Sequence, residues 1–123
     1  PIIFYSKISD QMSDRAYITP SDAGLFEKIK NDKGLVFASR EGAGILVWKT
    51  TLRPLYMDRY TTLNYVEKQT AWNHFLDGTA VQEAVVTYHP SYVLSEKKLD
   101  YSCLDELYVS ETYYYYRVLP TAC

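Results

Sequence analysis

The sequence predicts an α+β fold: a mostly antiparallel sheet of four to six strands with two helices packed on one face. Strand-like and helix-like stretches alternate irregularly along the chain. A glycine-containing segment of hairpin length separates two apolar stretches near the middle. The 123 residues fit one domain, and no linker or internal repeat divides them. We therefore expect a single globular domain over residues 1–123.

The N-terminal part is predicted to contain one strand and one helix. Residues 2–8 are β-branched and aromatic, which favours a strand. The helix is expected over residues 20–31, because Thr19 is a good N-cap and Pro20 a good first helical residue. Asp22 adds negative charge in the first turn, where the helix dipole favours it.

Two apolar strands are predicted in the middle of the chain, over residues 35–39 and 45–51. The segment 40–44 contains two glycines and joins them at the length of a hairpin loop. The apolar character of both strands indicates burial on both faces and hence a central position in the sheet. Pro54 interrupts residues 52–60, which we expect to be irregular.

The elements that follow are less regular in pattern. A second helix is predicted over residues 62–77, where apolar residues recur at helical spacing. Residues 83–88 contain adjacent valines and are predicted to form a strand, with a short helix over 80–86 as the alternative. Residues 91–95 could add a short strand, and residues 102–107 could form one helical turn.

The C-terminal stretch 107–120 contains four consecutive tyrosines and is predicted to be a strand. Side chains alternate along a strand, so Tyr113 and Tyr115 would lie on one face, and Tyr114 and Tyr116 on the other. Large rings on both faces suit a central strand that is covered on both sides. They also suit an edge strand that packs one face on the core and offers the other to a partner. The tyrosines are core residues in the first interpretation and a binding face in the second.

The composition limits the classes of function. The net charge of −2 argues against nucleic-acid binding through a strongly basic face. The sequence has no apolar stretch long enough to span a bilayer and no signal-peptide pattern, so we expect a cytoplasmic protein without a membrane partner. Tyrosine is in excess, at 13 residues, and tyrosine is enriched at recognition surfaces.

The sequence has two cysteines, Cys103 and Cys123, too few for a disulfide scaffold. We expect free thiols in a reducing compartment, with a single bridge as the alternative if the chain is exported. Neither cysteine lies in a Cys-x-x-Cys pair, and the histidines have no metal-ligand spacing. The sequence therefore predicts no metal site and no cofactor.

These observations favour a small protein that binds or inhibits another protein through a tyrosine-rich surface. The tyrosine excess and the lack of a catalytic motif motivate this hypothesis, with the tyrosine strand and residues 48–60 as the candidate surfaces. An exposed edge strand would also suit a homodimer formed by strand pairing. The predicted binding residues are Tyr113, Tyr114, Tyr115, Tyr116, Arg117, Trp48, Arg53, Tyr56, Arg59 and Tyr60.

The first alternative is a small enzyme whose residues meet only in the fold. A free amine at Pro1 would be a secondary amine that could act as a base or form an iminium. Residues 1–3, Pro-Ile-Ile, resemble the first strand of the tautomerase superfamily, which uses an N-terminal proline, and the resemblance implies a catalytic role for Pro1. The resemblance covers these three residues. The candidate catalytic residues are Pro1, His74, His89, Glu83 and Arg40.

The second alternative is a protein that binds single-stranded nucleic acid through residues 48–60. Basic residues interleaved with aromatic residues can stack the bases of a single strand. The same mixture arises from ordinary alternation along a strand, and the negative net charge counts against this alternative. The residues concerned are Trp48, Lys49, Arg53, Tyr56, Arg59 and Tyr60.

Overall fold

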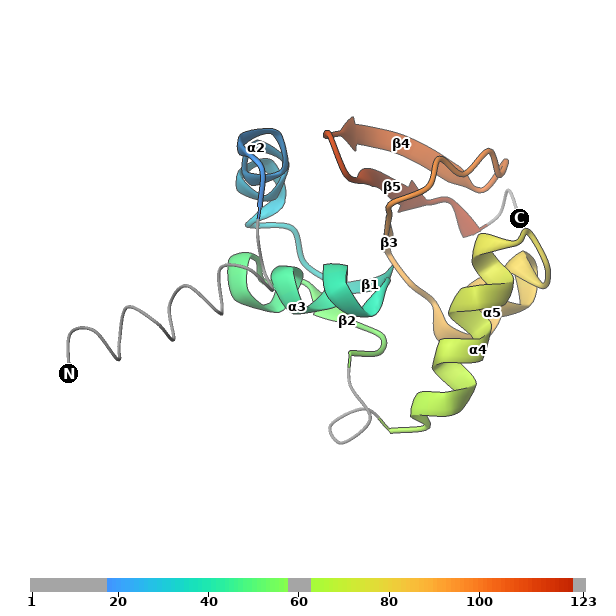
Figure 1. Cartoon of the computed structure of the whole chain (residues 1–123). Coiled ribbons are helices and arrows are strands. Elements are labelled where there is room, and N and C mark those ends of the chain that lie inside the picture. The colour runs from blue at the N-terminus through green and yellow to red at the C-terminus, as the bar shows by residue number, and fades with distance from the viewer. Residues whose placement is uncertain (1–17, 58–62, 121–123) are drawn as a thin grey trace.

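A five-stranded sheet lies between two pairs of helices in the computed structural model, which describes residues 18–57 and 63–120 (Figure 1). The predicted strand at residues 2–8 lies outside the described residues. The helices are α2 (Pro20–Ile29), α3 (Arg40–Lys49), α4 (Tyr65–Leu76) and α5 (Val81–Tyr88). The strands are β1 (Leu35–Ala38), β2 (Arg53–Pro54), β3 (Tyr92–Ser95), β4 (Leu104–Val109) and β5 (Tyr114–Val118).

The strands run in the order β2-β1-β3-β5-β4 and form a mixed sheet. Strand β1 is parallel to β2 and to β3, whereas β5 is antiparallel to β3 and to β4. The α+β class and the number of strands agree with the sequence prediction. The prediction of a mostly antiparallel sheet was wrong, because β1 pairs in parallel with both of its neighbours. Helices lead from β1 to β2 and from β2 to β3, and such crossovers connect parallel strands.

Helix α3 replaces the hairpin predicted between residues 35 and 51. The Ser39 hydroxyl accepts a hydrogen bond from the Gly42 N–H at 3.2 Å and caps a helix that includes residues 45–49 of the predicted strand 45–51. Gly42 allows close packing, because a Cβ there would lie 3.3 Å from Leu94 Cδ2. The glycine that suggested a turn is therefore a contact point between helix and sheet.

Two further predictions in the second half of the chain were wrong. Residues 83–88 belong to helix α5, close to the alternative helix at 80–86. Alanine and valine are compatible with either structure, and here Ala84 and Val85 face the core. The predicted helical turn at 102–107 is largely strand β4, because its backbone pairs with β5. The predicted helices at 20–31 and 62–77 correspond to α2 and α4.

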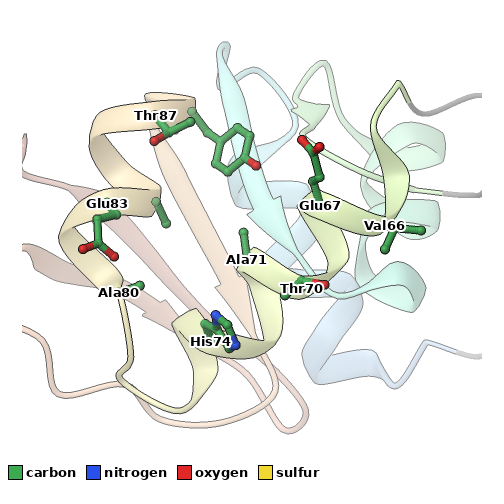
Figure 2. A pocket seen from close by; sticks show the side chains of 10 residues that line it. Val66, Glu67, Thr70, Ala71, His74, Ala80, Glu83 and Thr87 are labelled. Atoms are coloured by element: carbon green, nitrogen blue, oxygen red, sulfur yellow. The ribbon is translucent and has the colours of Figure 1, made fainter.

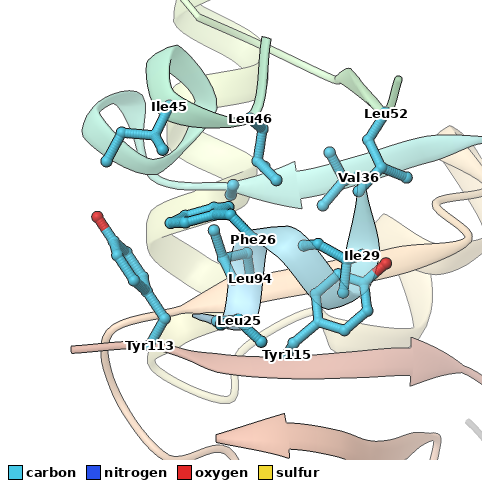
Figure 3. Close-up of a cluster of buried hydrophobic side chains, with 11 residues drawn as sticks. Leu25, Phe26, Ile29, Val36, Ile45, Leu46, Leu52, Leu94, Tyr113 and Tyr115 are labelled. Carbon is cyan, nitrogen blue, oxygen red and sulfur yellow. The ribbon is translucent and has the colours of Figure 1, made fainter. Parts of the chain in front are cut away.

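The helices cover both faces of the sheet, two on each, instead of one face. Alternate residues of β1 belong to different cores: Val36 packs with α2 and α3, and Phe37 packs with α4 and α5. Strand β3 repeats the pattern with Leu94 and Val93. Figure 3 shows the first of these cores, with side chains of α2 and α3 meeting the sheet.

Strand β5 confirms a strand at the tyrosines, but the predicted strand 107–120 was too long, because residues 107–109 belong to β4 and a turn follows them. Strand β5 lies inside the sheet, between β3 and β4. Tyr115 packs in the first core and Tyr116 in the second. The Tyr115 hydroxyl donates a hydrogen bond to Asp32 Oδ2 at 2.9 Å. The Tyr116 hydroxyl accepts one from the Leu99 N–H at 2.8 Å. Both buried hydroxyls are thus paired, as burial of a tyrosine requires.

Cys103 is buried and disulfide-bonded, so the expectation of a free thiol was wrong for this residue. Cys123, the other cysteine of the sequence, lies outside the described residues. Disulfides are typical of oxidising compartments. The bonded state of Cys103 therefore does not support the reducing compartment that we expected from the sequence.

The buried carboxylate of Asp22 fastens α2 to the turn between β4 and β5. Its Oδ1 accepts hydrogen bonds from the Ser110 hydroxyl and, at 3.0 Å, from the Thr112 N–H. The Glu111 N–H donates to Ser21 Oγ at 2.9 Å beside it. Burial raises the pKa of Asp22, but the hydrogen bonds from Ser110 and Thr112 outweigh burial and bring the pKa below 3.8.

We predict that Asp22→Asn lowers the free energy of unfolding by about 1–3 kcal/mol at pH 7, because two donors lose a charged acceptor. A lowered pKa in the folded state stabilises the protein above pH 3.8, and this stabilisation is lost as the pH falls through the folded-state pKa. Urea unfolding at pH 7 and pH 3 measures both effects. The variant should lose less stability on acidification than the wild type, with Glu111→Gln as the control. If Asp22→Asn and the wild type lost equal stability between pH 7 and pH 3, this would contradict a lowered pKa of Asp22.

Candidate functional site

The tyrosine strand contributes little to the surface. Tyr113, Tyr115 and Tyr116 are buried, and Tyr114 is half-buried. Burial raises the pKa of Tyr113 to about 12, and the charges of nearby carboxylates add to this effect. Arg117 is exposed and pairs with Asp105 at 2.8 Å on the neighbouring strand. The structure therefore agrees with the core interpretation of this strand, and its position inside the sheet contradicts the edge-strand interpretation.

Trp48 lies at the surface near the end of α3, and 64% of its area is exposed. Its neighbour Val47 is also exposed, because Ile45 and Leu46 take the core-facing positions of the helix. The ammonium group of Lys49 lies 4.0 Å from the centre of the Trp48 indole ring. We call Val47, Trp48 and Lys49 the Trp48 patch.

The Trp48 patch stands on a fixed helix end. The Thr50 N–H and the Thr50 hydroxyl both donate hydrogen bonds to the Leu46 carbonyl, at 2.8 and 2.6 Å. Arg53 follows on β2 and is exposed. These hydrogen bonds order the backbone at the end of α3, so a partner would meet Trp48 on an ordered helix end.

The other aromatic residues predicted between 48 and 60 do not extend this patch. Tyr56 is buried against the rings of Phe37 and Tyr65, and burial raises its pKa above the ordinary value. The remaining predicted residues, Arg59 and Tyr60, lie outside the described residues. The described part of the basic–aromatic segment thus presents Trp48, Lys49 and Arg53 but not Tyr56.

The structure brings two of the candidate catalytic residues to one groove. His74 on α4 and Glu83 on α5 both line it. No hydrogen bond or ion pair joins these two side chains within the described part of the chain. His89 follows α5 as its C-cap, Arg40 begins α3, and Pro1 lies outside the described residues. The described candidates therefore provide no linked acid–base pair.

The groove itself was not predicted from the sequence. It lies between α4 and α5 and has a volume of about 410 Å³ (Figure 2). The signal that could have indicated it is the set of short side chains at helical spacing on both helices. The lining residues are Val66, Glu67, Thr70, Ala71 and His74 of α4, with Ala80, Glu83, Ala84, Thr87 and Tyr88 from the α5 region.

Both edge strands of the sheet have features that disfavour a homodimer formed by strand pairing. Strand β4 forms one edge, and its pairing shifts register between Glu106 and Tyr108, as at a β-bulge. It also carries the carboxylates of Asp105 and Glu106. The other edge, β2, is two residues long and contains Pro54. Bulges, charges and proline are the features by which proteins prevent edge-to-edge pairing.

The described residues contain neither a cluster of metal-binding side chains nor a membrane-spanning helix. They contain no group of three histidine, cysteine or acidic side chains placed to hold a metal ion. None of the helices in residues 18–57 and 63–120 has the length and apolar character needed to cross a membrane.

Comparison with known proteins adds no family to these findings. No protein-family model, no curated protein and no solved structure matches the chain. The Trp48 patch and the groove are therefore interpreted from their own geometry.

We predict that the two tryptophans differ strongly in their access to solvent. Trp72 is 3% exposed in the core, in contrast to Trp48. In Trp48→Phe, the remaining fluorescence of Trp72 should resist quenching by acrylamide, whereas the wild type should show a second, readily quenched component. Identical quenching of variant and wild type would show that Trp48 is covered in solution.

Proposed function

We propose that this chain is a small protein-binding module, and that the Trp48 patch is the centre of its contact surface. The exposure of Trp48 on a fixed helix carries the proposal. Tryptophan is among the residues most enriched at the energetic centres of protein interfaces. A tryptophan can bury roughly 150–250 Å² when a partner covers it, so its exposure leaves a large apolar area available for binding.

The surroundings of Trp48 support a protein partner of defined character. Val47 extends the apolar area on the same helix. Lys49 supplies positive charge beside it, which favours a partner surface with an acidic group next to an apolar centre. This proposal keeps protein binding as the function and moves its centre from the tyrosine strand to α3.

The proposal is tested by affinity capture from a lysate of the source organism, quantified by mass spectrometry at low and high salt. Wild type and the control Val109→Ala, which shortens another exposed valine on β4, should retain the same partner at high salt. Trp48→Ala should retain at least about tenfold less of it, because truncation of a central tryptophan removes most of the contact energy.

Two results would contradict the proposal. One is a capture that returns no protein enriched over the empty support. The other is a partner that Trp48→Ala and wild type retain in equal amounts, which would place the contact surface elsewhere.

A further inference from the structure

The groove between α4 and α5 exists because the larger side chains of both helices face the sheet. Trp72 and Phe75 of α4, with Val85 of α5, belong to the core on that face. Short side chains, among them Ala71 and Thr87, face the space between the helices (Figure 2). Short side chains on two neighbouring helices leave a hollow that a longer side chain from another molecule can fill.

Apolar surface continues beyond the hollow. Val66, at its lip on α4, is 68% exposed, and Leu63, in the turn before α4, is 78% exposed. A hollow with an exposed aliphatic side chain at its lip is typical of an interaction surface.

The charged residues of the groove are acidic. Glu67 on α4 and Glu83 on α5 line it, one from each helix. Neither lysine nor arginine is among the ten described residues that line it. An occupant with positive charge beside its apolar face therefore complements the groove, and an acidic occupant would be repelled.

The helical walls of the groove favour a helical occupant over an extended peptide. The walls are helices, whose central N–H and C=O groups are hydrogen-bonded within each helix. An extended peptide would find few backbone partners on such walls, because it needs a sheet edge to pair with. A helix satisfies its own backbone and can enter with side chains alone.

We propose that the α4–α5 groove binds an amphipathic helix of a partner protein, with its apolar face in the groove and lysine or arginine beside Glu67 and Glu83. This site is separate from the Trp48 patch. The core residues of α3 and those of α4 and α5 pack on opposite faces of the sheet. Binding at the groove and binding at the Trp48 patch can therefore be tested independently.

A displayed peptide library tests this proposal on the full chain. The library holds 18-residue helical peptides with Leu, Ile, Met or Phe at the positions of one helical face, and Lys, Arg, Glu or Ala at all others. Selection on the immobilised wild type should enrich peptides rich in lysine and arginine. Selected peptides should bind about fivefold more weakly to Glu67→Gln/Glu83→Gln, whereas Glu106→Gln/Glu111→Gln should bind them as the wild type does.

A second pair of variants tests the hollow rather than its charge. Thr70→Trp places a large ring in the groove, and Asn73→Trp places the same ring on an exposed position of α4 outside it. Fluorescence anisotropy should show at least tenfold weaker peptide binding to Thr70→Trp and unchanged binding to Asn73→Trp, with circular dichroism confirming that both variants are folded. Trp48→Ala should bind the peptides normally, which separates this test from that of the Trp48 patch.

Three outcomes would overturn the proposal. The library could yield no enriched peptide, or peptides without an excess of basic residues. Alternatively, the enriched peptides could bind Thr70→Trp and Glu67→Gln/Glu83→Gln as strongly as the wild type, which would place them at another surface.

Discussion

The structure depends on one constraint: its three central strands carry large side chains on both faces, so both faces must be covered. Phe37, Val93 and Tyr116 point to one side of the sheet, and their neighbours in sequence point to the other. The two pairs of helices meet this requirement, and each supplies aromatic or aliphatic side chains to its own core. The buried tyrosine hydroxyls of β5 add a second requirement, because each needs a hydrogen-bond partner. Asp32 and the Leu99 backbone meet it from two different loops.

This constraint also determines where function can lie. The tyrosines of β5 fill the core and expose little of their surface, and the edges of the sheet carry a bulge, carboxylates and a proline. Within residues 18–57 and 63–120, the outer surface of the helices is the larger area left open to a partner. There the described chain exposes tryptophan on α3 and aliphatic side chains around the α4–α5 groove. An isolated exposed apolar residue is ordinary, but a fixed tryptophan beside a valine and a hollow with an apolar rim are features of binding surfaces.

Sequence reasoning predicted the helices and strands that have local signals. It was wrong where a segment fits either a strand or a helix and only packing decides between them. The cap at Thr19 and Pro20 located α2, and the four tyrosines located β5. The apolar residues 45–48 fit a strand or a buried helix equally well, and only the Ser39 cap and the fit of Gly42 against Leu94 favour a helix. Trp48, one of the predicted binding residues, is exposed, whereas the burial of Tyr56 depends on contacts with Phe37 and Tyr65 that the local sequence does not indicate. The groove combines side chains of two helices and has no contiguous sequence pattern.

The most direct test of this account is a spectrophotometric titration of the tyrosines, followed together with circular dichroism. Burial raises the pKa of Tyr113 to about 12 and moves those of Tyr56 and Tyr115 in the same direction. A raised pKa in the folded state stabilises the protein below pH 10, and this stabilisation is lost as the pH rises further. We predict that only part of the 13 tyrosines ionise near pH 10 in the folded chain, and that the rest ionise together with unfolding at higher pH. Ionisation of all tyrosines in one step near pH 10, with the circular dichroism unchanged, would show that the tyrosine strand is exposed and would contradict the account.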